Sequence, residues 1–251
     1  MDVKEQEKQN ENIRQRILDV EQIRIAECPS NSPWIRPVRI HYQQDGHQRD
    51  WDVVRAHDGV SIVVFNTSRK KLVFVRQFRP AYFYTFLPEK HGPVDLKQYP
   101  PRLGLTLELC AGIVDKDKSL AEIAKDELKE ECGYDAPLNS FEYVITFRYV
   151  STSVCKHTLF YVEVTDEMHT YPGGGAASEG ELIELVELSI PEVKQYINSK
   201  EVESPPCLLY GITWFLANKS KHFKLNSEIE TRLYRTLTKN KLQYNGTYLI
   251  E

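Results

Sequence analysis

The sequence is poor in features that would place a protein in a special class. Its 251 residues contain only five cysteines, and these are far apart, with no CxxC pair and no internal repeat around them. This pattern argues against a disulfide framework or a zinc site and indicates reduced thiols, as in the cytoplasm. The cysteines are Cys28, Cys110, Cys132, Cys155 and Cys207.

Long apolar runs and an excess of basic charge are missing as well. No segment reaches the roughly 18 apolar residues of a membrane span, and the N-terminal segment MDVKEQEKQNENIRQRI has no apolar signal core. The formal net charge is −4, so no global basic field attracts nucleic acid. We therefore expect a cytoplasmic protein that binds neither membrane nor nucleic acid, although a local basic patch could still bind an anionic small ligand.

The composition, 41% hydrophobic and 27% charged, is enough for one sizeable domain, alone or with an arm. Residues 3–18 are polar and predict a short solvated helix or a frayed start. Strand-like runs follow at 22–28, 37–43 and 50–56, and Asp45-Gly46 between the last two predicts a hairpin. Residues 1–56 are therefore expected to form an N-terminal helix and an antiparallel arm.

In residues 57–220 strand and helix patterns interleave, which predicts an α/β or α+β domain. Strands are expected at 60–65, 71–78, 105–110, 141–147, 158–164 and 182–188, and helices at 119–132, 190–197 and 207–218. Proline and glycine predict a surface loop at 88–104, and glycine predicts a mobile loop at 171–178. Residues 221–251 would form a C-terminal helix, at 227–238, and a tail.

The chemistry is concentrated in the expected helix 119–132. Ser119 fits an N-cap with Glu122 as its capping-box partner, and Gly133 is a natural stop. Three further carboxylates, at positions 127, 130 and 131, share one helical face with Cβ atoms about 5–6 Å apart. They repel one another unless a hard cation such as magnesium lies among them. Taken alone, the same pattern also fits a solvated acidic surface.

The surroundings of these glutamates resemble the Nudix box, a series of a glycine, glutamates and a final glycine at fixed spacing. Gly112, the loop after it and Glu127-Leu-Lys-Glu-Glu-Cys-Gly-Tyr134 match that spacing. The resemblance covers roughly residues 20–220 and is strongest to the branch that acts on uridine diphosphate glucose. The matching segments are 65–66, 75–81, 108–115, 130–134, 160–166, 173–175, 178–184 and 211–216.

The resemblance implies an α/β/α sandwich with a mixed sheet, and a homodimer formed through the N-terminal arm. It implies magnesium-dependent hydrolysis of a nucleoside diphosphate sugar, with manganese as an alternative metal. The reaction would convert UDP-glucose to UMP and glucose 1-phosphate. An ADP-ribose pyrophosphatase with the same machinery is the nearest alternative. A catalytically weak Nudix module that binds a nucleotide or a partner protein is the alternative from another class.

The resemblance also assigns roles to individual residues. Metal binding falls to Glu127, Glu131 and the carbonyl of Ala111, with Glu130 in support. The general base would be Glu179, with Glu181 as second choice, although without the resemblance a solvated turn before a strand is the better explanation for both. One or both of Arg76 and Arg79 would bind the diphosphate unless they are edge-strand charges, and Glu108 would bind sugar hydroxyls or metal. Trp51, Tyr82 and Tyr84 could stack on a base or simply pack, and His57 and His157 are interpreted as structural.

Two positions depart from the box pattern. Lys118 stands where the pattern has glutamate, and Asp126 stands where it has an arginine that pairs with a box glutamate. We expect Lys125 or Lys129 to compensate for Asp126 in part. On this basis Asp126→Arg is expected to raise kcat or to lower the magnesium requirement.

Overall fold

The computed structural model of the protein describes residues 3–176, 178 and 180–223. Its main element is a seven-stranded mixed sheet in which β12, β5, β4, β11 and β9 follow one another, while β7 pairs with β5 and β8 with β4. β4 and β11 run parallel, and the other pairs are antiparallel. These strands are β4 (Gly59–Asn66), β5 (Lys71–Phe78), β7 (Leu105–Glu108), β8 (Cys110–Ile113), β9 (Glu142–Arg148), β11 (Lys156–Val164) and β12 (Glu184–Ser189).

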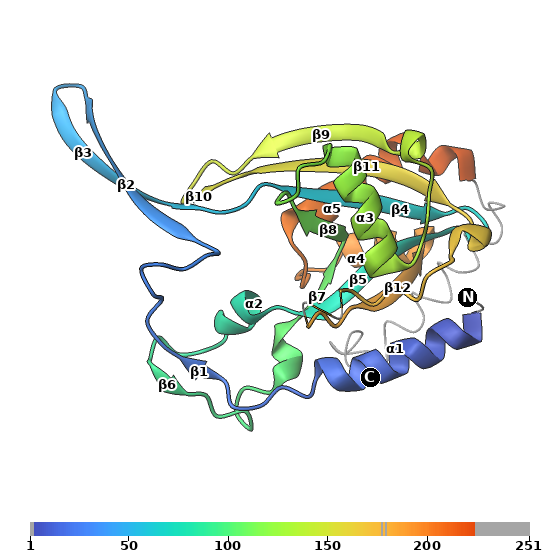
Figure 1. The fold of residues 1–251 in the computed structure, drawn as a ribbon, viewed down its shortest axis with the longest axis horizontal. Helices are drawn as coiled ribbons and strands as arrows, with labels where there is room; N and C mark the ends of the chain where they lie inside the picture. Colours follow the sequence, from blue (N-terminus) through green and yellow to red (C-terminus); the bar gives the residue numbers. More distant parts are fainter. Residues whose placement is uncertain (1–2, 177, 179, 224–251) are drawn as a thin grey trace.

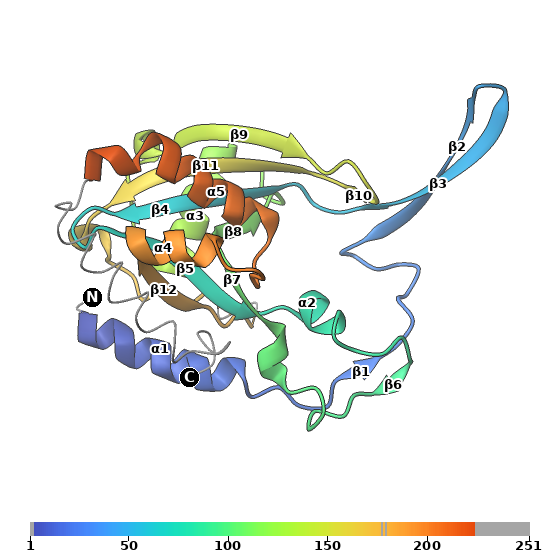
Figure 2. The same ribbon diagram turned by 180° about the vertical axis from the view of Figure 1, so that it is seen from behind.

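Helices cover both faces of this sheet. Figure 1 shows α3 (Leu120–Cys132) on one face, and Figure 2 shows α4 (Ile190–Ile197) and α5 (Pro206–Asn218) on the other. β4 contributes to both cores, because Ile62 and Val64 pack toward α3 whereas Val63 and Phe65 pack toward α5. A strand buried on both faces has a continuous apolar sequence. The arrangement is the α/β/α sandwich that the sequence predicts.

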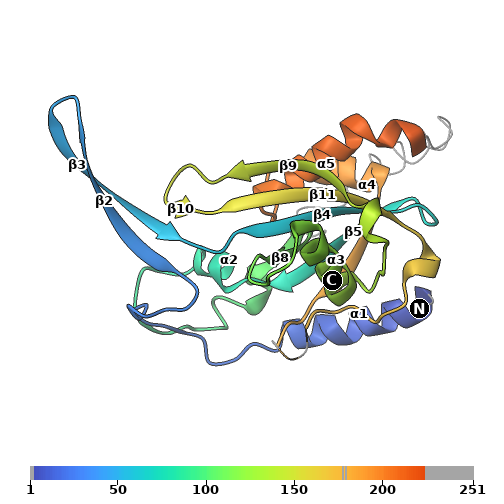
Figure 3. The ribbon, with the colours of Figure 1, turned by 45° about the horizontal axis from the view of Figure 1, so that its top comes forward.

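The predicted hairpin is also present and projects from the body of the molecule (Figures 1 and 3). β2 (Arg36–Gln44) and β3 (His47–Arg55) pair antiparallel around Asp45 and Gly46, whose φ angles of 53° and 74° suit a tight two-residue turn. Strand 22–28 is shorter than expected. Only β1 (Arg24–Ile25) forms, and it pairs with β6 (Gly92–Pro93) inside the predicted surface loop.

The expectation of a solvated or frayed N-terminal helix is wrong. α1 (Val3–Ile17) packs along β12, with Ile13 and Ile17 buried and the polar Gln6 and Asn10 buried beside them. The hydrophobic pattern of α1 does not predict this packing, because two of the four buried side chains are polar. Within the predicted segment 1–56, α1 therefore packs on the main sheet while the hairpin extends away from it. The three-part division at 56 and 220 stays a prediction.

The predicted strand 105–110 forms two strands, because the chain leaves β5 at Glu108 and joins β4 from Cys110 onward. The remaining elements are α2 (Pro80–Tyr84), β10 (Ser153–Val154) and the 3-10 turns Pro101–Gly104, Leu138–Ser140, Asp166–Met168 and Ser220–Phe223. The predicted helix 227–238 lies outside the described residues. No helix in the described ranges is long and apolar enough to cross a membrane.

Candidate active site

The predicted metal ligands lie on α3, and capping fixes the ends of this helix. The Ser119 hydroxyl accepts a hydrogen bond from the Glu122 N–H at 3.3 Å, and the Glu122 carboxylate accepts one from the Ser119 N–H at 2.8 Å. Gly133, with a φ of 77°, ends the helix. The predicted caps are therefore confirmed, and they fix where the helix that carries Glu127 and Glu131 begins and ends.

Glu131 is the innermost of the box carboxylates, with 3% of its surface exposed. Its Oε2 accepts a hydrogen bond from the Ala111 N–H at 2.9 Å. Burial raises the pKa of Glu131 to about 8, although the bond from Ala111 opposes the shift and Glu127 adds to it. A buried carboxylate of this kind favours the charged form only when a cation balances it.

Glu127 lies directly against the backbone of Gly112. A Cβ built at Gly112 would come within 2.2 Å of the Glu127 Cδ and 2.3 Å of its Oε1, so a larger residue would displace this carboxylate. Burial is the main cause that raises the pKa of Glu127 to about 7, and the neighbouring Glu130 is the next. Glycine is therefore needed at position 112, because any side chain there would clash with the Glu127 carboxylate.

Glu127 and Glu131 lie against the backbone of residues 111–112 and supply carboxylate oxygens of the kind that magnesium prefers. Within the described ranges, no three His, Cys, Asp or Glu side chains converge as a preformed metal cage. Magnesium does not need one, because it keeps several water ligands and completes its shell with substrate phosphates. These residues therefore fit a magnesium ion that binds together with a diphosphate. Glu130 is exposed on the same helix.

Arg79 lies at the end of β5 and is held by Glu108. Its Nε and Nη2 donate to the two carboxylate oxygens of Glu108, each at 2.8 Å, and Glu108 also accepts from the Thr106 hydroxyl at 2.6 Å. The bond to Glu108 is the main cause that raises the pKa of Arg79, and Glu131 and Glu181 contribute as well. The structure thus brings Arg79 near the box carboxylates. It also gives Glu108 a positioning contact that the sequence did not predict.

Arg76 faces a different carboxylate. Its Nη1 lies 3.2 Å from Oε2 of Glu184, whose side chain is 2% exposed, and Arg14 from α1 binds the other oxygen of the same group. Only 14% of the Arg76 side chain is exposed, against 45% for Arg79. Of the two arginines, Arg79 is therefore the more accessible to a ligand.

The glycine-rich loop before β12 packs on the C-terminal end of α3. The N–H groups of Gly174 and Gly175 donate to the carbonyls of Glu131 at 2.9 Å and Glu130 at 3.1 Å. Glu181 follows in the same loop, and its Oε2 accepts from the Ala176 N–H at 3.0 Å. Glu181 also raises the pKa values of the box carboxylates, so it lies near them. Glu179, the predicted base, lies outside the described residues.

Asp126 pairs with a residue other than the two that were expected. Lys118 Nζ lies 2.5 Å from Asp126 Oδ2, whereas Lys125 pairs with Asp135 at 2.9 Å. Lys129 lies 3.9 Å from the centre of the Tyr171 ring. Lys118 is therefore the direct partner of Asp126, which was not expected, whereas Lys129 interacts with Asp126 only electrostatically, at longer range. Both departures from the box pattern belong to one ion pair of reversed polarity, which ties the loop between β8 and α3 (residues 114–119, the box loop) to α3.

This pair changes the expected effect of Asp126→Arg. The single variant would place a second cation beside Lys118 and release the loop, so we expect kcat/KM on a nucleotide sugar to fall several-fold. The double variant Lys118→Glu with Asp126→Arg restores opposite charges in the order of the box pattern, and it should regain most of that loss. Steady-state kinetics at low and high salt would measure both. Equal loss in the single and double variants would contradict the pairing.

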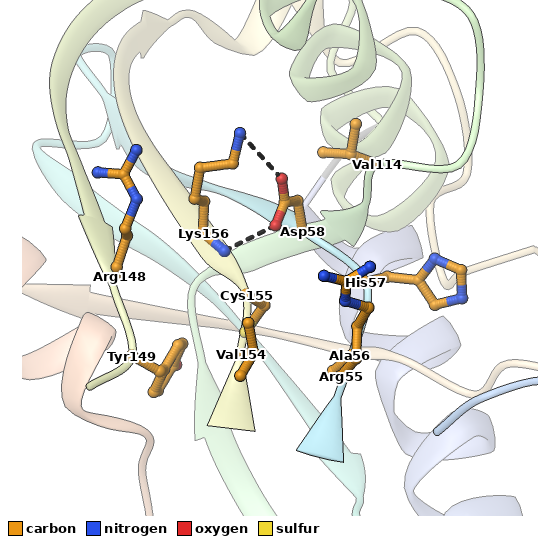
Figure 4. Close-up of a pocket in the computed structure, with 10 residues that line it drawn as sticks. All are labelled: Arg55, Ala56, His57, Asp58, Val114, Arg148, Tyr149, Val154, Cys155 and Lys156. Carbon is orange, nitrogen blue, oxygen red and sulfur yellow. Dashed lines mark hydrogen bonds and ion pairs between the residues drawn. The ribbon is translucent and has the colours of Figure 1, made fainter. Parts of the chain in front are cut away.

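A separate hollow of about 550 Å³ lies beside the box loop, with Val114 in its wall (Figure 4). Arg55, Arg148 and Lys156 make it basic, and none of the predicted site residues lines it. Asp58 accepts from the Lys156 N–H at 2.7 Å through its carboxylate, and from the Val114 N–H at 2.8 Å through its carbonyl. Asp58, just before β4, therefore links the box loop to the start of β11 at the edge of this hollow.

The contacts of His157 agree with a structural role. Its ring hydrogen-bonds the Ser61 hydroxyl at 2.6 Å, and burial lowers its pKa. Trp51 on the hairpin and Tyr84 on α2 are 51% and 47% exposed, so neither is a core residue.

Sequence reasoning missed the contribution of α1 altogether. The four-residue spacing of Ile13 and Ile17 was the available signal, and it was weak.

Comparison with known proteins agrees with the fold and the site. The chain is 39% identical over 210 residues to uridine diphosphate glucose pyrophosphatase NUDT14 of Mus musculus, which covers 78% of this chain and 94% of the relative. The Bos taurus protein of the same name is 37% identical over 211 residues, covering 79% and 95%. A GDP-mannose pyrophosphatase of Klebsiella pneumoniae is 29% identical over 158 residues, covering 62% and 69%. No family model matches the chain.

Together, the sandwich fold, the capped box helix and these similarities define a hydrolase of the Nudix class. The chain belongs to the Nudix hydrolase family, within the group of nucleotide-sugar pyrophosphatases.

Proposed function

We propose that the protein hydrolyses the diphosphate bond of a nucleoside diphosphate sugar with magnesium, and that UDP-glucose is converted to UMP and glucose 1-phosphate. The observation that carries the proposal is the position of Glu127 and Glu131 against the backbone of residues 111–112, with Arg79 near enough for the charge of Glu131 to raise its pKa. Carboxylates for a metal beside a guanidinium for phosphate suit a substrate that is itself a metal-bound diphosphate. The names of the two mammalian relatives support uridine diphosphate glucose as the substrate.

In this proposal Glu127, Glu131 and the Ala111 carbonyl hold magnesium, with Glu130 in support. The bound ion would neutralise the diphosphate and stabilise the charge that develops on its oxygens. Arg79 would bind a phosphoryl oxygen, held in position by Glu108.

A water molecule attacks one phosphorus, and the bridging P–O bond on that phosphorus breaks. The loop carboxylate, Glu179 or Glu181, takes the proton of the water. UMP and the sugar 1-phosphate leave as separate phosphate monoesters. We place the reaction in the cytoplasm, where the five free thiols of the chain would stay reduced.

Release of phosphate monoesters tests the proposal directly. The purified protein is incubated with UDP-glucose, GDP-mannose or ADP-ribose and magnesium, and a phosphatase then frees phosphate only from the products. We expect UDP-glucose to give the highest kcat/KM and EDTA to abolish release. A higher kcat/KM on ADP-ribose would overturn the assignment of UDP-glucose and make the protein an ADP-ribose pyrophosphatase. Nucleotide binding without release from any substrate would support the weak binding module instead.

The raised pKa values of Glu127 and Glu131 predict how metal affects stability. Their ordinary value is 4.5, so between about pH 4.5 and pH 8 the folded protein binds more protons than the unfolded chain. The stability of the metal-free protein should therefore fall as pH rises through that window. Magnesium binds the charged form and should raise Tm most at the alkaline end. Thermal unfolding in EDTA and in magnesium, from about pH 4.5 to pH 8, measures the rise in Tm that magnesium causes. A rise that is the same at every pH would contradict the prediction.

We also propose that the protein forms a homodimer through the hairpin. Ile40 and Trp51 are directly paired across β2 and β3, and Val38 lies on the same face two residues away. These three side chains are 47%, 51% and 46% exposed, although they are large and apolar. An exposed apolar face of this kind is typical of a protein interface.

Light scattering after size-exclusion chromatography tests the dimer. We expect a dimer mass for the wild type, and a shift toward monomer in Ile40→Lys, with the dimer Kd raised by at least about tenfold. Gln48→Lys adds the same charge to a polar position of the hairpin and should leave the dimer intact. A monomeric wild type at micromolar concentration would refute the proposal.

A further inference from the structure

The basic hollow beside the box loop lies where the base of the hairpin meets the main sheet (Figure 4). Its walls come from four parts of the chain, namely residues 55–58, Val114, residues 148–149 and residues 154–156. Its volume of about 550 Å³ falls within the range of roughly 300–1,000 Å³ that is usual for small-molecule sites. The hollow therefore has room for a small ligand.

Two cations of the hollow stand opposite each other on neighbouring strands. Arg148 on β9 and Lys156 on β11 are directly paired in the antiparallel register. Their side chains therefore leave the same face of the sheet, with Cβ atoms about 4.5–5.5 Å apart. Arg55, at the end of β3, adds a third positive charge to the same hollow. Like charges in directly opposed positions repel each other, so this arrangement favours a bound anion.

Asp58 is the one carboxylate among the residues that line the hollow, and Lys156 occupies it. Its carboxylate accepts from the Lys156 N–H at 2.7 Å and lies 3.3 Å from Lys156 Nζ. Figure 4 shows Lys156 between Asp58 and Arg148, in agreement with the strand order β4, β11, β9. The side chains of Arg55 and Arg148 form no hydrogen bond or ion pair with any described residue. Two guanidinium groups thus remain available to a ligand.

The chemistry of the walls indicates which anion fits. A guanidinium group presents parallel N–H donors that match the oxygens of a phosphate group. Tyr149 and Val154, which are 43% and 39% exposed, add apolar surface for the remainder of an organic phosphate. Neither Glu127 nor Glu131 lines the hollow, so binding there does not require the metal of the candidate active site.

We propose that this hollow is a second anion site, which binds the phosphate group of a small phosphate monoester without a metal. Arg55 and Arg148 bind the phosphate oxygens, and Lys156 adds its charge while Asp58 holds it in place. The bound phosphate lies next to the box loop, since the Val114 N–H donates to the Asp58 carbonyl at 2.8 Å. The inference is independent of the proposed hydrolysis.

NMR titrations of the isotope-labelled full chain test the site. They are run in EDTA at constant ionic strength, with inorganic phosphate, UMP and glucose 1-phosphate as probes. We expect the amide signals of residues 55–58, 114–119 and 148–156 to shift together. Arg55→Ala and Arg148→Ala should each raise the Kd of phosphate by at least about tenfold, because each removes charge-assisted hydrogen bonds. The probe with the lowest Kd shows whether a nucleotide, a sugar phosphate or phosphate itself is preferred.

Two further variants place the binding event. Arg16→Ala removes an exposed arginine of α1, outside the hollow, and should bind phosphate as the wild type does. Arg79→Ala should leave this metal-free binding unchanged as well. If Arg79→Ala abolishes binding while Arg55→Ala and Arg148→Ala retain it, the phosphate occupies the candidate active site and the proposal is overturned. Equal shifts of the same amides with chloride would also overturn it, because they would show a basic surface without selectivity for phosphate.

Discussion

Glu131→Gln is expected to lower magnesium-dependent turnover of a nucleotide sugar by about 10³-fold while leaving the fold intact. Glu131 is buried, and its carboxylate is held by the Ala111 N–H. Glutamine has the same shape and can accept that hydrogen bond through its amide oxygen, so packing should survive. It cannot supply the negative charge that a magnesium ion requires. The free energy of unfolding without metal should stay constant or rise, because the repulsion from Glu127 is relieved.

Steady-state kinetics against magnesium concentration, together with thermal unfolding in EDTA, measure both halves of this prediction. Glu167→Gln is the matched control, since Glu167 is exposed and far from the box in sequence. Its kcat should equal that of the wild type. Unchanged activity in Glu131→Gln would remove the metal assignment, whereas a large fall in Tm in EDTA would show that the residue acts chiefly in folding.

Local patterns predicted the elements that position the site. The capping box at Ser119 and the stop at Gly133 are interactions between neighbours in sequence, so the ends of α3 could be predicted within one residue. The turn at Asp45 and Gly46 is local in the same sense. The apolar run at residues 62–65 of β4 also predicted a strand, because burial on both faces favours apolar residues at successive positions.

The contacts that tune the site are long-range, and no pattern of spacing predicts them. Lys118 and Asp126 each looked like an isolated departure from the box, and only the path of the loop shows that they neutralise each other. Asn10 is buried although it is polar, because its partner is the backbone of a strand 175 residues away. Glu108 and Glu184 likewise acquire their arginine partners from distant parts of the chain, Glu108 from the end of β5 and Glu184 from β5 and α1.

Two further variants, Glu179→Gln and Glu181→Gln, identify the general base. Glu179→Gln is expected to lower kcat by about 10²–10⁴-fold with little change in KM, since a base acts in the transition state and contributes little to ground-state binding. Glu181→Gln should show a smaller loss. Glu181 already accepts a hydrogen bond from the Ala176 N–H within its own loop, which suits a residue that shapes the loop.

A pH profile distinguishes the two roles more sharply than the rate at one pH. Removing the base should flatten the acidic limb of kcat, whereas removing a residue that shapes the loop should scale the whole profile down and leave its form unchanged. Each variant is compared at saturating magnesium, so that loss of metal does not imitate loss of the base. If Glu181→Gln flattens the limb and Glu179→Gln only scales it, the assignments are exchanged. Then the carboxylate that lies close enough to raise the pKa values of Glu127 and Glu131 is the one that takes the proton.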